Sequence, residues 1–385
     1  KFIKRDLNEL ISYGIGIISV VSGTSDQETL CTFVNELYLK RSLISIAPLL
    51  SFADKNTDPF SQIVSQIEHQ LNELSKDLNE NNETLENQVK EVQEQVKLQA
   101  VSKGIIGLRS GINSLDEKTG GWQGGHLITI AGRPAMGKSV FAIIIALEVS
   151  TTEKVLVFSR EMTSSEILKR AVCAKGSFTM SELFSGSITA ERLGDFNNET
   201  NNLLNHNLII NEHDYRINDI VYQIRRQAIQ GLGLVIIDYL QLLEGSGFKQ
   251  NDTSALTEIT RTLKQVAKTL NIPIIILSQL NREVEARPRK VPQLSDLKQS
   301  GSIEEDSNMV IFCYRPEYYD INDFPNGDDA EGMAHLIIAK NRNGRTGFVK
   351  TGFSGNKAQF FDLEESYKPN NLIDYTQSAR PTDLF

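Results

Sequence analysis

The residues best suited to chemistry form the segment GRPAMGKS, which runs from Gly132 to Ser139. It has the spacing GxxxxGK[ST] and lies between two apolar runs, HLITIA before it and VFAIIIALEV after it. The order of strand, glycine loop and helix is typical of a loop that holds the phosphates of a nucleoside triphosphate. The alternative is a chance glycine turn, but chance alone would not supply the flanking strand and helix.

Each part of this loop has a physical task. Gly132 and Gly137 permit turns that aim backbone N–H groups at phosphate oxygens, and the helix that follows favours an anion at its start. Lys138 is expected to reach the outer phosphates as a point charge, and the hydroxyl of Ser139 to join the shell of Mg²⁺. We therefore predict that ATP binds the whole loop: Gly132, Arg133, Pro134, Ala135, Met136, Gly137, Lys138 and Ser139.

Three further polar residues each follow an apolar run. Asp238 ends LVIID and is predicted to orient the magnesium ion; the alternative is a capping or turn aspartate. Glu161 follows VLVFSR and could polarise the water that attacks the γ-phosphate, unless it is an exposed glutamate at a helix start. Gln279 ends IIILSQ, where its amide could sense the γ-phosphate, although amides are common at strand ends.

Two cations, Lys340 and Arg342, lie in IIAKNRNGRTG beside the hairpin-turn signal Asn343-Gly344. One interpretation is a solvated basic turn. The other is that these cations project into the nucleotide site of a neighbouring subunit, where they would stabilise the charge of the transition state.

The composition limits the partners that the chain can bind. Its 385 residues, 40% of them apolar, are enough for a sizeable core and for more than one domain. A net charge of −9 argues against a basic surface wrapped by nucleic acid, so any such contact must be local. The three cysteines show no metal spacing and no apolar run could span a bilayer, so we expect buried thiols in a cytoplasmic protein without membrane contact.

The pattern of apolar residues predicts several regions. Residues 1–54 read as a partial helical N-terminal domain, which begins without a methionine, and 55–103 as a helical linker. The linker carries two apolar stripes, Ile63 to Leu78 and Leu85 to Val96. Either both pack on their own domain, or the part from Ile63 to Leu74 docks on a neighbouring subunit. Residues 104–368 alternate helical segments with the buried runs ITIAG, VLVFS, LVIIDYL, IPIIILSQ, MVIFCY and HLIIAK, which predicts an α/β fold with a mostly parallel sheet. Residues 369–385 read as a tail.

Six blocks appear in one order, and together they closely resemble the C-terminal motor domain of the DnaB-type replicative helicases, hexameric RecA-like ATPases. The blocks are GLRSGINSLDEKTGGWQGGHLITIAGRPAMGKS, FSREM, LVIIDYLQLLEGSG, IILSQLNREVE, LSDLKQSGSIEEDSNMVIF and IIAKNRNGRTG. The resemblance covers residues 104 to 365 and implies a RecA-like motor domain.

The resemblance also implies roles for individual residues. Lys138 and Ser139 correspond to the phosphate lysine and the magnesium hydroxyl, and Arg170 to an arginine at the nucleotide. The hydrolytic group comprises the catalytic Glu161, the magnesium-orienting Asp238, the γ-phosphate sensor Gln279, and Lys340 and Arg342 supplied in trans. The active sites are thus expected to lie between subunits.

The segment DLKQSG resembles the loop that holds single-stranded DNA inside the ring, which gives Lys298, Gln299 and Gly301 as DNA-binding residues. The family more often has Arg-Glu where this chain has Lys298-Gln299. A lysine still supplies charge for the phosphates, without the bidentate fork of an arginine, and backbone N–H groups near Gly301 could add contacts that ignore sequence.

The function expected from the resemblance is an ATP-dependent DNA helicase. It would form a homo-hexameric ring around single-stranded DNA, move 5′ to 3′ and separate a forked duplex, in the cytoplasm at the nucleoid. Primase and a helicase loader are the expected partners. The alternative is a RecA-like ATPase that forms filaments or acts as a regulatory switch.

Overall fold

The computed structural model describes residues 85–101, 105–245, 253–297 and 301–363. The chain divides into two compact units, residues 1–91 and 92–385. The predicted N-terminal domain (1–54), the first apolar stripe of the linker and the predicted tail (369–385) lie outside the described residues. Within the predicted linker, helix α4 (Leu85–Val101) is described, and the apolar residues Leu85, Val89, Val92 and Val96 are exposed on it.

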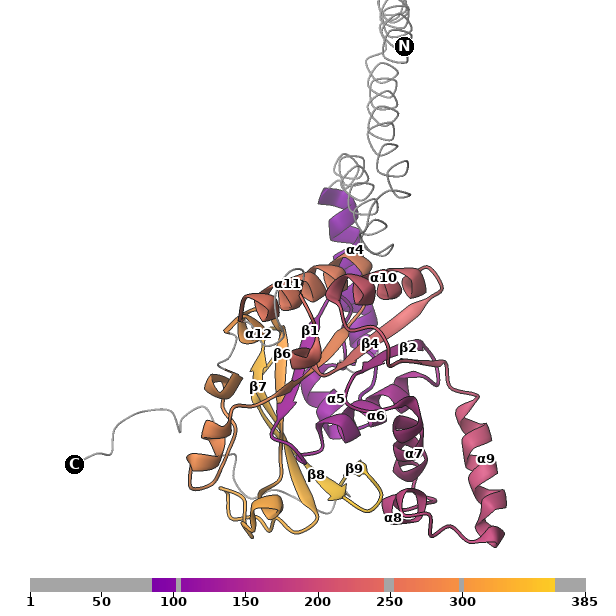
Figure 1. Cartoon of the computed structure of the whole chain (residues 1–385). Coiled ribbons are helices and arrows are strands. Elements are labelled where there is room, and N and C mark those ends of the chain that lie inside the picture. The colour runs from indigo at the N-terminus through magenta and orange to yellow at the C-terminus, as the bar shows by residue number, and fades with distance from the viewer. Residues whose placement is uncertain (1–84, 102–104, 246–252, 298–300, 364–385) are drawn as a thin grey trace, which may run out of the picture. The chain divides into compact units, whose positions relative to one another are not determined.

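The described part of the second unit is built on one mixed sheet (Figure 1). Its strands are β1 (Leu127–Gly132), β2 (Lys154–Ser159), β3 (Leu208–Asn211), β4 (Leu232–Asp238), β5 (Ile274–Gln279), β6 (Met309–Tyr314), β7 (Met333–Asn341), β8 (Gly347–Ser354) and β9 (Gln359–Asp362). The order across the sheet is β3-β2-β4-β5-β1-β6-β7-β8-β9. The first six strands in that order are parallel to one another. Strands β7, β8 and β9 continue the sheet in antiparallel pairs. The predicted α/β fold with a mostly parallel sheet is confirmed.

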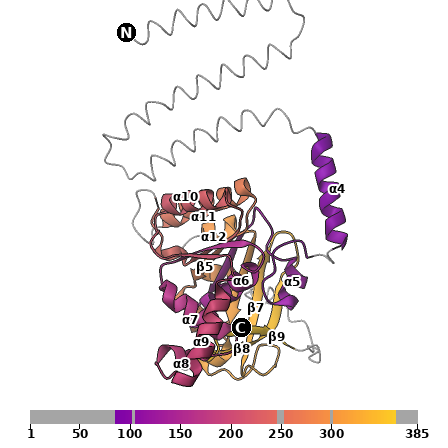
Figure 2. The ribbon, with the colours of Figure 1, turned by 90° about the vertical axis from the view of Figure 1, so that its right-hand side faces the viewer.

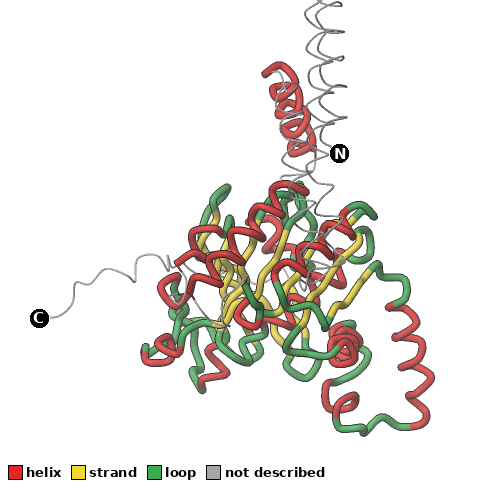
Figure 3. Tube along the Cα trace, turned by 45° about the horizontal axis from the view of Figure 1, so that its top comes forward, coloured by secondary structure: helices red, strands yellow, loops and turns green. Residues whose placement is uncertain are grey.

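Helices cover both faces of this sheet, as Figures 2 and 3 show from two directions. They are α5 (Asn113–Thr119), α6 (Lys138–Val149), α7 (Ser164–Ala174), α8 (Met180–Phe184), α9 (Leu193–Leu203), α10 (Ile217–Ala228), α11 (Thr253–Leu270) and α12 (Gly301–Asp306). Because successive side chains of a strand point to opposite faces, each buried strand contributes to two cores. One core packs on α5 and α6, and the other on α10 and α11.

The strand directions determine which residues can share a site. Strands β1, β2, β4 and β5 are parallel, so the loops that follow them meet at one edge of the sheet. In register, Gly132 lies beside Gln279 and Ser159 beside Asp238. Strand β7 runs the other way, and its last residues pair with the start of β6 at the opposite edge.

Cys173 and Cys313 are free and buried, as expected, while Cys31 lies outside the described residues. Among the helices that the structure describes, none combines the length and the apolar character needed to span a membrane.

Candidate nucleotide site

The glycine loop joins β1 to α6, as the sequence pattern predicts. Gly137 is in the left-handed region with φ 95°, and a Cβ atom there would lie 2.8 Å from the ring of Phe360. A non-glycine residue, Ala135, also has a positive φ of 62°. The first turn of α6 closes at once, because the N–H of Phe141 donates to the carbonyl of Gly137 at 2.9 Å. The loop therefore presents its backbone at the start of a buried helix, where anions bind.

Lys138 is the first residue of α6, and its ammonium donates to the carbonyl of Arg133 at 3.2 Å, across the loop. Burial lowers the pKa of Lys138, while the neighbouring Asp238 and Glu161 act in the opposite direction. A phosphate group would favour the charged form of this amine in the same way. Arg133 faces elsewhere: its guanidinium donates to Glu285 at 2.7 Å and to the carbonyl of Leu280 at 2.9 Å. Only the backbone of Arg133 is thus directed toward the predicted cradle.

Asp238 is the last residue of β4, and its side chain is buried. Burial raises the pKa of Asp238 to about 6, and a hydrogen bond from the Ser139 hydroxyl opposes that shift. Its Oδ1 atom has no hydrogen-bond partner among the residues that the structure describes. An unpaired buried carboxylate oxygen is costly, and a divalent cation would remove that cost. The pair Ser139 and Asp238 therefore fits a Mg²⁺ site.

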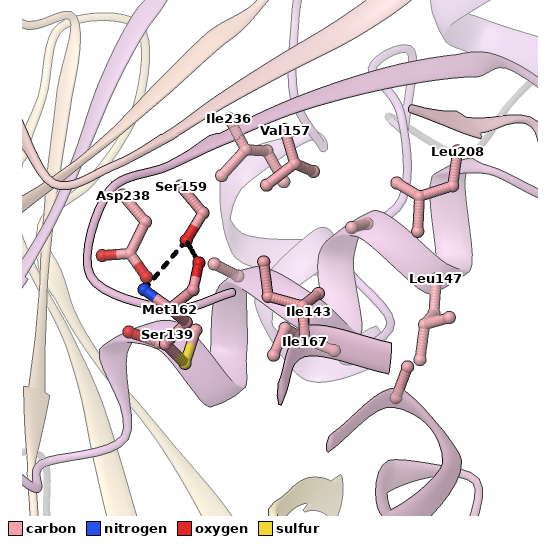
Figure 4. Close-up of a pocket in the computed structure, with 13 residues that line it drawn as sticks. Ser139, Ile143, Leu147, Val157, Ser159, Met162, Ile167, Leu208, Ile236 and Asp238 are labelled. Carbon is pink, nitrogen blue, oxygen red and sulfur yellow. Dashed lines mark hydrogen bonds between the residues drawn. The ribbon is translucent and has the colours of Figure 1, made fainter. Parts of the chain in front are cut away.

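The rest of the site suits Mg²⁺ bound together with phosphate oxygens. In the described ranges, no three His, Cys, Asp or Glu side chains gather into a group that could hold a metal ion. Mg²⁺ commonly takes only one or two carboxylates from a protein and completes its shell with water and substrate phosphates. Figure 4 shows Ser139, Ser159 and Asp238 at one end of a cavity of about 20 Å³ whose other walls are apolar.

Glu161 lies in the bend between β2 and α7 and is exposed. The helix itself begins three residues later, at Ser164; Thr163 is its N-cap, and Glu166 completes the capping box. Glu161 is therefore not the carboxylate that caps this helix. Its charge acts on both Lys138 and Asp238, which brings a solvent-accessible carboxylate to the edge of the phosphate site.

Arg170 projects from α7 toward the same site. Its guanidinium lies 5.8 Å from the centre of the Phe184 ring, and its positive charge opposes the rise that burial causes in the pKa of Asp238. The Nε atom of Arg170 is buried and has no hydrogen-bond partner in the described parts of the chain. A buried, unpaired guanidinium N–H beside a phosphate loop fits the predicted contact with a nucleotide.

Gln279 ends β5 beside Gly132, so the predicted sensor and the phosphate loop are neighbours. Its backbone is held by Gln241, whose side chain donates to Gln279 O and accepts from Gln279 N, each at 3.3 Å. Gln241 was not predicted from the sequence. The signal was present, because Gln241 lies only three residues after Asp238, at the same strand end.

Lys340 and Arg342 lie at the other edge of the sheet. Lys340 pairs with Val310 near the start of β6, and its ammonium donates to the carbonyls of Glu304 and Glu305, the latter at 3.4 Å. Arg342 also donates to the carbonyl of Glu305. Burial and the charge of Arg342 lower the pKa of Lys340. The two cations thus contact the C-terminal end of α12, where a helix favours positive charge.

The predicted DNA loop is described only in part. Lys298 and Gln299 lie outside the described residues, and Gly301 is the exposed first residue of α12. The turn before the loop is firmly held: the buried carboxylate of Asp296 accepts from Gln293 N at 2.7 Å and from the guanidinium of Arg287.

One arginine at the phosphate loop was not predicted from the sequence. Arg315 directly follows β6, and its Nη1 donates to the carbonyl of Ala135 at 3.0 Å. Its guanidinium stacks 3.6 Å from the centre of the Phe353 ring, whose edge also lies below Gly137. The only sequence signal was a cation just after a buried strand.

The chain is similar to known proteins of one family. The family model of the DnaB-like helicase C-terminal domain matches residues 107–362. The replicative DNA helicase DnaB of Geobacillus stearothermophilus is 39% identical over 268 residues, which are 68% of this chain and 58% of that protein. The replicative DNA helicase DnaC of Bacillus subtilis is 35% identical over 369 residues, 93% of this chain and 79% of that protein.

A solved structure is also similar. It is titled as a DnaB-like replicative helicase and its interactions with primase, and it matches with a TM-score of 0.73 and 29% identity over 90% of this chain and 82% of that one. A phosphate loop, a buried aspartate and an amide thus meet at one sheet edge in a fold shared with these helicases. The chain belongs to the family of the DnaB-like helicase C-terminal domain.

Proposed function

We propose that this chain is the motor of a ring-shaped replicative DNA helicase, which hydrolyses ATP between neighbouring subunits to move along single-stranded DNA and open a forked duplex. The phosphate loop, Lys138 and Arg170 bind the nucleotide, and Glu161 orients the attacking water. Ser139 and Asp238 hold Mg²⁺, which when bound would neutralise charge on the phosphates. Gln279 senses the γ-phosphate.

The observation that carries this proposal is the separation of the two cations from the phosphate loop. Lys340 pairs with Val310, and Val310 pairs with Thr129, three residues before Gly132 on β1. At about 3.3 Å per residue the strand alone separates the two levels by roughly 10 Å. Lys340 and Arg342 are moreover bonded to the end of α12, on the side away from the loop. They are therefore suited to complete the site of an adjacent subunit rather than their own.

The wider assignment rests on the relatives. A homo-hexamer that moves 5′ to 3′ is the arrangement expected of the family, and the solved relative is titled for its interactions with primase. We extend both to this chain, with primase and a loader as partners. Lys298, Gln299 and Gly301 are proposed to contact the DNA backbone, which suits a motor that must pass any sequence.

The test compares the unwinding of a forked DNA by the full chain with that of the Lys138→Ala variant. The proposal predicts ATP-dependent unwinding by the wild type and loss of both hydrolysis and unwinding in the variant. Electron microscopy with single-stranded DNA and a nonhydrolysable ATP analogue should give closed rings. Open filaments, or hydrolysis without strand separation, would contradict the helicase assignment.

A further inference from the structure

Gln241 lies in the short 3₁₀ turn Leu240–Leu242 that follows β4. Its side-chain amide bonds the neighbouring strand β5 at three points. Nε2 donates to the hydroxyl of Ser278 at 3.0 Å and to the carbonyl of Gln279 at 3.3 Å, and Oε1 accepts from the N–H of Gln279 at 3.3 Å. An amide that donates to and accepts from one residue fixes both the position and the orientation of its backbone.

These contacts occur where the backbone pairing of the two strands has ended. The paired register between β4 and β5 runs from Val235 and Ile274 to Ile237 and Ile276, and goes no further. The end of β5 therefore needs another link to the end of β4. The amide of Gln241 supplies that link between the strand that carries Asp238 and the strand that carries Gln279.

The backbone after Gln279 is also bonded to two other parts of the site. The guanidinium of Arg133 donates to Leu280 O at 2.9 Å, which connects it to the phosphate loop. The N–H of Asn281 donates to the carbonyl of Asp296 at 3.0 Å, in the turn that precedes the predicted DNA loop. Residues 279–281 thus have bonded neighbours on the nucleotide side and on the DNA side, and Gln241 is the link to the proposed magnesium strand.

We propose that Gln241 is a positioning residue that sets the amide of Gln279 against the γ-phosphate and keeps it in register with Asp238. This inference rests on the proposed function, because it assigns a partner to the γ-phosphate sensor. Gln241 acts through Gln279, so its loss should impair hydrolysis and its stimulation by DNA much more than nucleotide binding. A displacement of about 1 Å at such a site can cost ~10²-fold in rate.

The experiment replaces Gln241 with methionine, which keeps the length of the side chain and removes its hydrogen bonds. The matched control is Gln230→Met, at an exposed glutamine beyond the end of α10 whose side chain has one described hydrogen bond, accepted from Lys154 at 3.4 Å. For Gln241→Met we expect an ATP-analogue affinity within ~3-fold of wild type, a kcat at least ~10-fold lower and little stimulation by single-stranded DNA. The control should behave as wild type in all three assays.

A double-mutant cycle separates positioning from a general structural role. If Gln241 acts through Gln279, adding Gln241→Met to Gln279→Ala should lower kcat by less than ~2-fold beyond Gln279→Ala alone. Should Gln241→Met fail to fold, Ser278→Ala serves instead. It removes one of the three contacts at a fully buried serine and should give a smaller loss of DNA stimulation.

Three outcomes would overturn the inference: wild-type kcat and stimulation in Gln241→Met, additive effects in the cycle, or an affinity that falls in parallel with kcat and melting temperature. These outcomes are distinguishable from failure of the proposed function. If the proposed function is wrong, the wild-type chain itself will not hydrolyse ATP in response to DNA, whatever the residue at position 241.

Discussion

Gly137→Ala tests how strongly the backbone of the phosphate loop depends on a glycine. Gly137 has φ 95°, and an added Cβ would lie 2.8 Å from two ring atoms of Phe360 and 3.2 Å from the ring of Phe353. Both rings belong to the packed aromatic cluster beneath the loop, at 4.9 Å between their centroids. The rings cannot swing into solvent, so either they or the loop must shift.

The size of the effect can be worked out with a control in the same chain. Gly176 has nearly the same φ, 93°, but a Cβ there would meet nothing within 4 Å. Gly176→Ala should therefore cost only the backbone strain, about 1–2 kcal/mol. Gly137→Ala adds overpacking of about 1–3 kcal/mol, which gives a total of about 2–5 kcal/mol.

Both variants can be followed by urea unfolding, with the fluorescence of Trp122 as the signal. This residue is the only tryptophan in the sequence and is buried in the motor unit. Binding of a fluorescent ATP analogue should weaken by at least ~10-fold in Gly137→Ala and stay unchanged in Gly176→Ala, because only Gly137 shapes the cradle. Equal unfolding energies for the two variants, or normal binding by Gly137→Ala, would refute this reasoning.

Two further predictions concern buried titratable groups. Asp238→Asn should abolish ATPase activity while the melting temperature stays equal or rises, because the variant no longer buries a carboxylate; a large fall in melting temperature would count against this. His335 stacks between Phe324 and Phe348, and burial lowers its pKa to about 3. The unfolded chain takes up a proton below pH ~6.5 and the folded chain does not, so stability should fall by about 1.4 kcal/mol per pH unit from 6.5 toward 4. Urea midpoints should show a shallower fall in His335→Asn; parallel pH profiles for wild type and variant would contradict it.

Much of the fold could be predicted from the sequence because the six apolar runs are strands buried on both faces. Their composition alone is typical of a parallel sheet with helices on each side. Strands β3, β8 and β9 were not predicted. β3 is a half-buried strand of four residues, and β8 and β9 mix glycine, lysine and polar residues with their apolar positions. Such short or mixed patterns do not distinguish a strand from a loop.

Some residues of the candidate site have a signal in the local sequence, and others depend on tertiary packing. The loop from Gly132 to Ser139 has a local signature, and parallel strand ends bring Asp238 and Gln279 to it. The side-chain partners of the loop depend on packing between distant segments. Arg133 belongs to the loop, yet its side chain bonds Glu285. Arg315 was not predicted, because only the folded sheet brings the end of β6 to the carbonyl of Ala135.

The central claim is that each site is completed by a neighbouring subunit, and mixing two inactive variants tests it most directly. Lys138→Ala removes the phosphate-binding lysine of its own subunit, and Arg342→Ala removes the cation that we propose acts in the site of the next subunit. In randomly mixed rings about a quarter of the interfaces would join an intact loop to an intact cation. The account predicts that the mixture hydrolyses ATP well above the average rate of the two variants. A rate no higher than that average would contradict it.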